Sequence, residues 1–440
     1  MISVQDNTEK IIVPCSDIGE LKYLGNCPIS ELIKENRGIV FYPKLFDIKN
    51  SEQRIENNHI FDYYEKHNHL NNVYLSTNNL VGIISKGEST LKIHSRFDEG
   101  GKDFFLYYLF SKVFKINILD SNISFVKNNI FNILAYMFPK YLSDAMGQGL
   151  YKEYVYRYNN DMKINGRIDL NKFIKCDIPF HGKVSYVSRD YFIDNKLNQL
   201  IRHTIEFLKQ KNILEVLKYG NKDFNDNVNL IYQITQDYNM NDRKRVILNN
   251  IIKTLNHPYY YNHKKLQQLC IDILTNCGVV YSDDNNFAYG FLIDISWLFE
   301  EYLFVLLKKL NFKHSLNRLH INGMTYFDNK NARMKIYPDF YIANKIVCDA
   351  KYKKNVWLST DVHQMASYML RLKLDKALLI KPKYQGGSNI ELRKIKDIDK
   401  VIGTAFINLP VNCNSYKDFV NKMHESENKF LQTIEDYINK

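Results

Sequence analysis

The segment formed by residues 335–351 constrains the fold more than any other part of this 440-residue sequence. Apolar or small residues alternate with polar ones along it, which is typical of two strands whose faces meet different surroundings. If residues 343–345 form a tight connection, Asp339 lies opposite Asp349 in an antiparallel pair, with Cβ atoms about 5 Å apart. Lys351 then shares a face with Asp349, because side chains two residues apart in a strand point the same way. The opposite face carries only apolar or small residues: Ile336, Pro338, Phe340, Ile342, Ile346, Cys348 and Ala350.

Two carboxylates and an ammonium on one strand face suggest a metal-dependent site. Carboxylates with a backbone carbonyl nearby, here that of Ala350, suit Mg²⁺, a hard cation that keeps several of its waters. Mn²⁺ accepts the same oxygen ligands. Such a metal polarises a phosphoryl oxygen and activates a water, while a lysine orients that water or stabilises developing charge. The alternative is a polar outer hairpin face with an incidental Asp–Lys pair, and the short PD…DxK pattern by itself is compatible with both.

Two flanking helical segments favour the metal site. Gln364 and Tyr368 stand four residues apart in the helix predicted after the strand pair, so both side chains lie on one face. The apolar helix predicted at about 293–310 is interrupted by Glu300 and Glu301. A carboxylate set into such a helix is a candidate further metal ligand, and a solvated helix face is the other interpretation. The sequence thus contains, in order, a helix with a glutamate, a strand with Pro338-Asp339, a strand with Asp349 and Lys351, and a helix with Gln364 and Tyr368. Chance is a poor explanation for this order of four features.

The whole chain is predicted to be an α+β protein with three domains. Residues 1–115 are β-rich, with a hairpin at 81–94 whose turn contains Gly87. Residues 116–285 are mainly helical, and residues 286–440 combine strands and helices as an α/β domain. Extended segments are expected at 151–170 and 182–187. We predict helices at about residues 104–113, 130–141, 195–213, 242–257, 264–276, 293–310, 361–372 and 417–439.

Composition and charge narrow the class of protein. Apolar residues make up 45% and charged residues 25%, which excludes a mostly disordered chain. The 60 basic residues exceed the 48 acidic ones, and the net charge of +12 fits a nucleic-acid partner, although Lys-rich soluble chains share it. No apolar run approaches 18 residues and no secretory signal is visible, so we expect a cytoplasmic protein without membrane spans. The seven cysteines are widely spaced without a CxxC pair, which indicates free thiols.

The order of these features resembles the PD-(D/E)XK nuclease core, in the branch with a QxxxY element. The wider chain resembles the McrC family, the nuclease subunits of McrBC-type modification-dependent restriction systems, to which LlaJI-type restriction subunits are related. The blocks that carry the resemblance span most of the chain after about residue 80: Val81-Gly-Ile-Ile-Ser-Lys-Gly, Leu91-Lys-Ile-His, Asn165-Gly-Arg-Ile-Asp169, Phe192-Ile-Asp-Asn-Lys-Leu-Asn198, Leu298-Phe-Glu300, Pro338-Asp339, Asp349-Ala-Lys-Tyr-Lys353, Gln364-Met-Ala-Ser-Tyr368 and Leu378-Leu-Ile-Lys-Pro382.

This resemblance implies roles for individual residues. The oxygen ligands of the metal would come from four residues: Asp339, Asp349, Ala350 through its carbonyl, and Glu300. Glu301 is the fallback for the helix carboxylate. Lys351 would be the catalytic lysine, while Gln364 and Tyr368 would position the backbone phosphate or brace the site.

The resemblance also implies a substrate and a partner. The substrate would be double-stranded DNA carrying a modification such as 5-methylcytosine, in a system of phage defence. The chain has no GxxxxGK[ST] motif and hence no P-loop, so if the system uses nucleotide energy, its NTPase must be a separate chain. In the family this partner is an AAA+ GTPase ring that recognises modified DNA and translocates, and the β-rich part, here residues 1–115, engages it and stimulates hydrolysis. A double-strand cut needs two active sites, which suggests pairing of complexes.

Three other interpretations remain open at this point. One is a self-sufficient PD-(D/E)XK nuclease in DNA repair, which a neighbouring gene for an AAA+ NTPase would argue against. Another is a sequence-specific restriction subunit of the LlaJI type. The third is a DNA-binding and NTPase-activating scaffold whose nuclease site is idle, and the intact set of Asp339, Asp349 and Lys351 argues against it.

Overall fold

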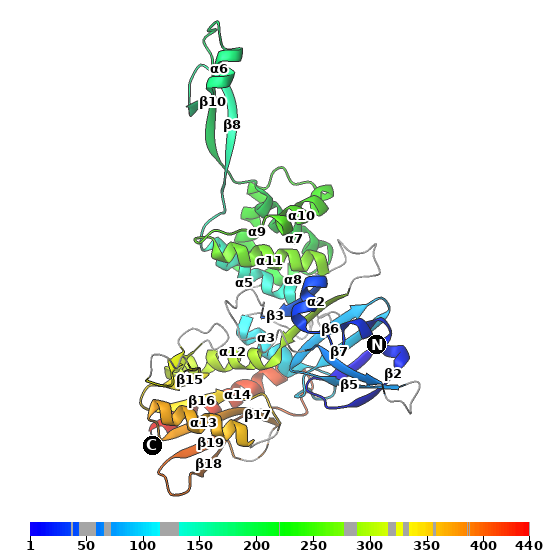
Figure 1. Cartoon of the computed structure of the whole chain (residues 1–440), viewed down its shortest axis with the longest axis vertical. Coiled ribbons are helices and arrows are strands. Elements are labelled where there is room, and N and C mark those ends of the chain that lie inside the picture. The colour runs from blue at the N-terminus through cyan, green and yellow to red at the C-terminus, as the bar shows by residue number, and fades with distance from the viewer. Residues whose placement is uncertain are drawn as a thin grey trace. The chain divides into compact units, whose positions relative to one another are not determined.

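A computed structural model describes residues 1–36, 38–43, 59–65, 72–114, 132–219, 221–276, 288–315, 323–328, 334–354, 358–384, 386 and 388–439. These residues form two compact units of mixed helices and sheets (Figure 1). Unit 1 combines Met1–Asn132 with Asp284–Lys440, and unit 2 is Ile133–Asp283. The two ends of the sequence therefore belong to one unit, and the middle of the chain forms the other. The mixed α and β character agrees with the predicted class, while the division into functional domains at 115/116 and 285/286 stays a prediction.

The N-terminal part of unit 1 is built on a five-stranded sheet. Its strands, in spatial order, are β1 (Ile2–Gln5), β7 (Ser89–His94), β6 (Leu80–Lys86), β11 (Tyr289–Asp294) and β3 (Gly38–Tyr42). β1 runs parallel to β7 and β11 runs parallel to β3, whereas β6 is antiparallel to both of its neighbours. A smaller sheet contributes to the same apolar core and consists of β2 (Ile11–Pro14), β5 (Asn72–Thr77) and β4 (Phe61–Glu65). Short helical turns complete this part: α1 (Cys15–Ile18), η1 (Gly19–Leu24) and α2 (Ile29–Glu35).

The predicted hairpin at residues 81–94 is confirmed by β6 and β7, which pair antiparallel. One strand of this sheet differs from the expectation, because β11 lies between β6 and β3 although residues from 286 onward were assigned to the C-terminal domain. Gly82 allows β11 to approach β6 closely. Its φ is 151°, and a Cβ atom there would lie 2.0 Å from the carbonyl oxygen of Phe291. Only glycine fits this position without moving the neighbouring backbone.

The C-terminal part of unit 1 contains a six-stranded sheet. Its strands, in spatial order, are β12 (Lys313–His314), β15 (Phe340–Ile342), β16 (Ile346–Ala350), β17 (Lys376–Tyr384), β19 (Val401–Leu409) and β18 (Ile390–Lys394). β16, β17 and β19 are parallel to one another, and the outer strands join them antiparallel. A separate two-stranded ladder is formed by β13 (Met324–Thr325) and β14 (Lys335–Ile336). This part is α/β, as predicted for its sequence.

Three helices pack on this sheet, α12 (Ile295–Leu307), α13 (Ser359–Leu372) and α14 (Tyr416–Asn439), and α3 (Phe104–Phe114) packs against α12 and α14. α12 runs into the short turn η4 (Lys308–Leu310). α13 packs against β16 and β17, and α14 packs against β19. The buried carboxylate of Glu427 on α14 joins three of the helices, because it accepts hydrogen bonds from Tyr108 at 2.6 Å, Tyr302 at 2.9 Å and Lys112 at 2.9 Å. This contact ties α3 and α12 to the C-terminal helix.

Unit 2 has a helical body, as predicted for the middle of the chain. Its helices are α5 (Asn132–Met146), α7 (Lys196–Gln210), α8 (Leu214–Lys218), α9 (Lys222–Ile234), η3 (Met240–Asp242), α10 (Arg243–Ile252) and α11 (Tyr261–Asn276). α7 packs against α9, α10 and α11. Asn195 caps α7 by accepting hydrogen bonds from the N–H groups of Leu197 and Asn198, both at 3.1 Å. Asn198 donates in turn to the carbonyl of Ile193 at 2.7 Å, so these asparagines brace the start of the helix.

Unit 2 also contains a long hairpin (Figure 1), which contains the two predicted extended segments. β8 (Glu153–Asp161) and β10 (Val184–Phe192) pair over nine residues each, which at about 3.3 Å per residue is a length of about 30 Å. The short strand β9 (Arg167–Ile168) and helix α6 (Leu170–Cys176) complete it. Gly166 has a φ of 156°, and a Cβ there would lie 2.3 Å from the carbonyl oxygen of Val187. Asp169 caps α6 by accepting from the N–H of Lys172 at 3.2 Å, which is a structural role for a residue of the 165–169 block.

Within the described ranges, no helix combines the length and the apolar character that a bilayer span requires.

Candidate functional site

The predicted strand pair forms with the predicted register. Phe340 pairs with Cys348, and the same register places Asp339 opposite Asp349. Asp339 lies directly before β15, and its Oδ2 accepts a hydrogen bond of 2.8 Å from the backbone N–H of Ala350. The alternation in the sequence therefore brings two carboxylates to one end of the strand pair.

Both carboxylates are buried. Asp339 is 7% exposed and Asp349 is 1% exposed, because β16 is covered by α13 on the face that includes Val347. Burial raises the pKa of Asp339 well above its ordinary value, and the negative charges of Asp349 and Glu300 raise it further. Burial also raises the pKa of Asp349, although the positive charge of Lys351 opposes this. A solvated outer face of the hairpin is thereby excluded.

Lys351 connects the strand pair to α13. Its Nζ forms an ion pair with Asp349 and donates a hydrogen bond of 3.0 Å to Oε1 of Gln364. Nε2 of Gln364 donates to the hydroxyl of Tyr368 at 2.8 Å, and that hydroxyl donates to the carbonyl of Tyr337 at 3.3 Å. Burial lowers the pKa of Lys351, but the charge and hydrogen bond of Asp349, together with the charges of Asp339 and Asp361, outweigh burial and the net pKa is raised. The structure thus brings Gln364 and Tyr368 into one hydrogen-bonded chain with the lysine.

Helix α12 contributes carboxylates beside Asp339. Nε2 of His314 lies 3.6 Å from Oε1 of Glu300 and 3.9 Å from Oε1 of Glu301, while its Nδ1 hydrogen-bonds the carbonyl of Asp339 at 2.8 Å. Burial lowers the pKa of His314, but its hydrogen bonds to Glu301 and to the Asp339 carbonyl, with the charges of both glutamates, raise it overall. Of the two glutamates, Glu300 is the one whose negative charge raises the pKa of Asp339.

His314 was not singled out from the sequence. It lies in β12, shortly after the helix that carries the two glutamates, and no spacing rule links the three residues. The only feature of the sequence that could have drawn attention to His314 is that it is a single histidine between an apolar helix and the strand pair.

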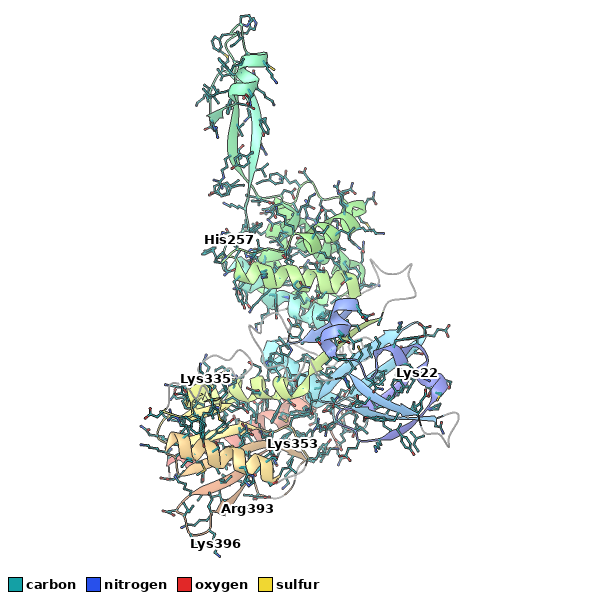
Figure 2. The ribbon with its side chains drawn as sticks, in the orientation of Figure 1. Lys22, His257, Lys335, Lys353, Arg393 and Lys396 are labelled. Carbon is teal, nitrogen blue, oxygen red and sulfur yellow. The ribbon has the colours of Figure 1, made fainter. Side chains whose placement is uncertain are left out.

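A second charged group adjoins the site, and the roles of Asp361 and Lys381 in it were not predicted from the sequence. Nζ of Lys353 (labelled in Figure 2) donates to both carboxylate oxygens of Asp361, at 3.0 and 3.3 Å. Asp361, in the first turn of α13, is buried, and Lys381 on β17 is only 1% exposed. Burial lowers the pKa of Lys381 to about 8, although the charge of Asp361 opposes the shift. A lysine inside the apolar run 377–382 is the signal that would have identified it.

The donor atoms at this end of the strand pair fit a divalent metal. Two buried carboxylates that repel each other are stabilised by a cation with a preference for oxygen. Pro338 lies opposite Ala350 in the continued register and has no N–H, so the ladder supplies no donor for the Ala350 carbonyl. In the described part of the chain, no three His, Cys, Asp or Glu side chains are grouped so as to hold a metal by themselves. Mg²⁺ does not require such a group, because it binds through one or two carboxylates and keeps several waters.

The sequence matches the profile of a known family, described as "McrBC 5-methylcytosine restriction system component", over residues 75–382. The chain belongs to the McrBC family. The matched range of this McrBC-family chain contains β6 and β7, the hairpin of unit 2 and every site residue described above. The resemblance to the McrC family is thereby confirmed. No curated protein matches the sequence.

The fold of this McrBC-family chain is shared with a solved structure from Thermococcus gammatolerans. That structure is a refined half-complex from a tetradecameric assembly of McrB AAA+ hexamers with bound McrC, and the matched chain is 14% identical with a TM-score of 0.54. The match covers 99% of this chain and 100% of the other. The cryo-EM structure of the T. gammatolerans McrBC complex also matches, at 14% identity over 70% of this chain and 87% of that chain. Its TM-score of 0.35 is too low to show a common fold. The first match shows a common fold along the full length.

Proposed function

We propose that this chain is the endodeoxyribonuclease subunit of an McrBC-type restriction system, with a metal-dependent PD-(D/E)XK site. The connected set of Asp339, Asp349, Lys351 and Gln364 carries the proposal. A merely structural ion pair does not require a second buried carboxylate that repels the first, whereas perturbed carboxylates of this kind cluster at functional sites. Family membership supports the same conclusion, because the family is described as a component of a restriction system.

The chain's own residues would hold Mg²⁺, or Mn²⁺ in its place, through Asp339, Asp349 and the carbonyl of Ala350. When bound, the metal supplies polarisation of a phosphoryl oxygen and a more acidic water. Glu300 adds a further negative charge beside Asp339, and His314 links this glutamate to the backbone of Asp339. His314 thus fixes the position of helix α12 relative to the strand pair, next to the proposed oxygen ligands.

Lys351 would stabilise the charge that develops on the phosphate. Its raised pKa keeps the ammonium protonated at neutral pH. Gln364 accepts one of its hydrogen bonds and Tyr368 orients Gln364, so the ammonium is directed before substrate arrives. Lys353, partly exposed and held by Asp361, supplies a second cation for contact with the DNA backbone.

We further propose that an AAA+ GTPase ring of the McrB kind acts with this chain on double-stranded DNA that contains 5-methylcytosine. The absence of a P-loop motif from the sequence requires nucleotide hydrolysis to come from another chain. The fold match to a chain from an assembly of McrB hexamers with bound McrC supports a ring as that partner. The net charge of +12 fits DNA as the substrate, and two complexes would pair to cut both strands.

Two surfaces are candidates for the contact with this ring. Residues 1–115 take this role by the family resemblance. The hairpin of unit 2 is the second candidate, because Tyr154, Tyr156 and Tyr158 on β8 are 44%, 63% and 64% exposed. Large aromatic side chains gathered on an exposed strand mark a protein-binding surface more often than chance.

Plasmid cleavage with Mg²⁺ tests the proposal directly. Modified and unmodified plasmids would be incubated with wild type, Asp349→Ala or Lys351→Ala, each with and without the neighbouring NTPase and GTP or ATP. We expect cleavage of modified plasmid only with the partner and GTP, and a loss of about 10³-fold or more in both variants, because each removes charge stabilisation at the reacting phosphate. Lys345→Ala is the matched control, since Lys345 is an exposed lysine in the turn of the same strand pair.

Each other outcome identifies an alternative. Cleavage by the chain alone would identify a self-sufficient nuclease of the repair kind. Cleavage of unmodified plasmid at one defined sequence would identify a LlaJI-type subunit. Stimulated NTP hydrolysis without cleavage, unchanged in Lys351→Ala, would identify a scaffold with an idle site.

A further inference from the structure

The backbone at Lys351 is not set by the strand ladder alone, because β16 ends at Ala350. The N–H of Lys351 donates to the carbonyl of Ile380 on β17 at 2.9 Å, and its own carbonyl accepts from the N–H of Lys353 at 2.9 Å. Tyr352 therefore lies inside a tight turn directly after the lysine. A displacement of Tyr352 would therefore move the backbone of Lys351 and change the direction of its Cα–Cβ bond, along which the side chain leaves the backbone.

Tyr352 is held by residues 95–97, which come from the other end of the chain. Nη1 of Arg96 donates to the carbonyl of Tyr352 at 3.0 Å. The hydroxyl of Tyr352 lies 2.5 Å from Oγ of Ser95, which also accepts from the N–H of Phe97 at 2.9 Å. The ring of Phe97 stands edge-on to that of Tyr352, with centroids 4.9 Å apart. Tyr352 is 4% exposed, so its backbone, hydroxyl and ring all have fixed partners.

Arg96 is itself fixed to the N-terminal sheet. Its Nε donates to Oδ2 of Asp6 at 2.8 Å within a buried ion pair, and its Nη2 donates to Oδ1 of Asn79 at 2.5 Å. Asp6 and Ser95 directly follow the parallel strands β1 and β7, whose last residues Gln5 and His94 are paired. The contacts on Tyr352 are therefore made by the carboxyl edge of that sheet.

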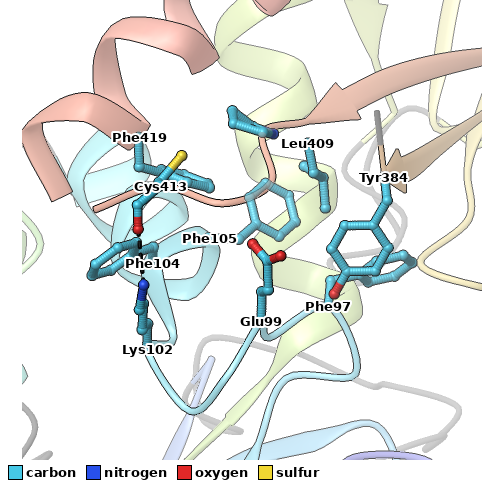
Figure 3. Close-up of a pocket in the computed structure, with 10 residues that line it drawn as sticks. Phe97, Glu99, Lys102, Phe104, Phe105, Tyr384, Leu409, Cys413 and Phe419 are labelled. Carbon is cyan, nitrogen blue, oxygen red and sulfur yellow. Dashed lines mark hydrogen bonds between the residues drawn. The ribbon is translucent and has the colours of Figure 1, made fainter. Parts of the chain in front are cut away.

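Aromatic side chains fill the space around Tyr352. Phe105 stacks against its ring, and Phe97 and Phe105 also line a pocket with Tyr384 (Figure 3). Phe299, the neighbour of Glu300 on α12, lies 5.4 Å from the Tyr352 ring between centroids. The same ring thus contacts the N-terminal segment and the helix that carries the site's third carboxylate.

We propose that Ser95 and Arg96 are positioning residues for the nuclease site. They hold Tyr352, and through it the backbone of Lys351, in the geometry in which the ammonium meets Asp349 and Gln364. This inference rests on the proposed role of Lys351 and adds that the N-terminal sheet sets the position of the lysine. Because residues 1–115 are also a candidate contact for the NTPase, a shift of this sheet on partner binding would reach Lys351 through Arg96 and Tyr352.

Tyr352→Phe tests the inference with little disturbance of packing, because it removes only the hydroxyl bonded to Ser95. Tyr384→Phe is the matched control, since it removes a hydroxyl from the same aromatic cluster without touching the turn after Lys351. In partner-activated cleavage we expect kcat to fall about five- to tenfold in Tyr352→Phe, the effect of one hydrogen bond, with KM for DNA unchanged. Ser95→Ala should give the same loss, Ser95→Thr should restore activity, and the double variant Ser95→Ala with Tyr352→Phe should be no worse than either single change.

A measurement independent of cleavage separates this inference from the proposed function. An amine-reactive reagent labels Lys351 at a rate that mass spectrometry can follow. This rate reports how firmly the ammonium is held, and Lys345 serves as the internal reference. We expect Lys351 to be labelled severalfold faster in Tyr352→Phe and in Arg96→Lys, with Lys345 unchanged. Arg96→Lys is interpreted only if it folds, and Tyr352→Phe decides the matter otherwise. Labelling of Lys351 equal to wild type in Tyr352→Phe would overturn the inference, whether or not the wild-type chain cuts DNA.

Discussion

The strand pairs β15–β16 and β8–β10 are both antiparallel, yet they are stabilised in opposite ways. β16 is buried on both faces, with Ile346 and Val347 fully covered; Asp349 is paired with a lysine, and Asp339, before β15, with a backbone N–H. β8 leaves Tyr156 and Tyr158 exposed on a ladder of nine residues. Burial favours partners for the polar groups of the first pair, and contacts of this kind hold side chains in one arrangement. The second pair has apolar surface to offer to another molecule.

Side-chain hydrogen bonds replace a core at the end of the exposed pair. Asp177 accepts from the backbone N–H of Ser185 at 2.6 Å and from the side chain of Asn160 at 2.6 Å. Burial raises the pKa of Asp177, but these hydrogen bonds outweigh it and the net pKa is lowered. Ionic and aromatic contacts add to this, such as Arg189 over the ring of Tyr154 at 3.7 Å. The hairpin is thus ordered by polar contacts that leave its aromatic face available.

The largest expected difference between the two pairs is in folding stability. Ile346→Ala removes a fully buried side chain and should lower the free energy of unfolding by about 2–5 kcal/mol, because it leaves a cavity. Tyr156→Ala should change it by less than about 0.5 kcal/mol, since the side chain is mostly solvated. Chemical denaturation of both variants measures the difference. Equal losses would mean that Tyr156 is buried in solution.

A smaller effect is expected on partner-activated cleavage. Replacing Tyr156 and Tyr158 together by Ser should reduce NTPase-stimulated cleavage about tenfold, because aromatic anchors dominate the energy of protein interfaces. Tyr219→Ser is the control, as Tyr219 is an exposed tyrosine of the same unit outside the hairpin. The measurement is the dependence of cleavage on NTPase concentration. Unchanged dependence would leave residues 1–115 as the contact surface.

The smallest effect is local to the tip of the hairpin. Asp177→Ala should speed amide hydrogen exchange in α6 and β9 about tenfold without shifting the melting temperature of the whole chain, because local and global opening are separate. The lowered pKa sets the sign of the pH dependence: protection at the tip is complete above the ordinary pKa of Asp and is lost as the pH falls through the lower pKa of the folded state. Asp161→Ala on β8 is the comparison. Exchange unaffected by Asp177→Ala would show that Gly166 and the ladder hold the tip without this carboxylate.

Much of the site was accessible from sequence because its residues follow local rules. The two-residue period of a strand and a tight turn placed Asp339 opposite Asp349, and the helical period placed Gln364 with Tyr368. The choice between Glu300 and Glu301 was not accessible, because neighbouring helix positions differ by rotation of the helix against the sheet. The pairing of β11 with β3 was not accessible for a related reason, since it joins segments about 250 residues apart in the chain.

The sequence by itself determined the strand register, the QxxxY helix face and the family of this protein, since each depends on residues close together along the chain or on a recognisable order of motifs. Only the tertiary structure decided that His314 joins Glu300 to Asp339, that Lys381 is buried beside Asp361, and that Arg96 holds the residue after Lys351. The physical reason is that these contacts depend on how sheets and helices pack. Packing is settled by the burial of many side chains together, which no local spacing encodes.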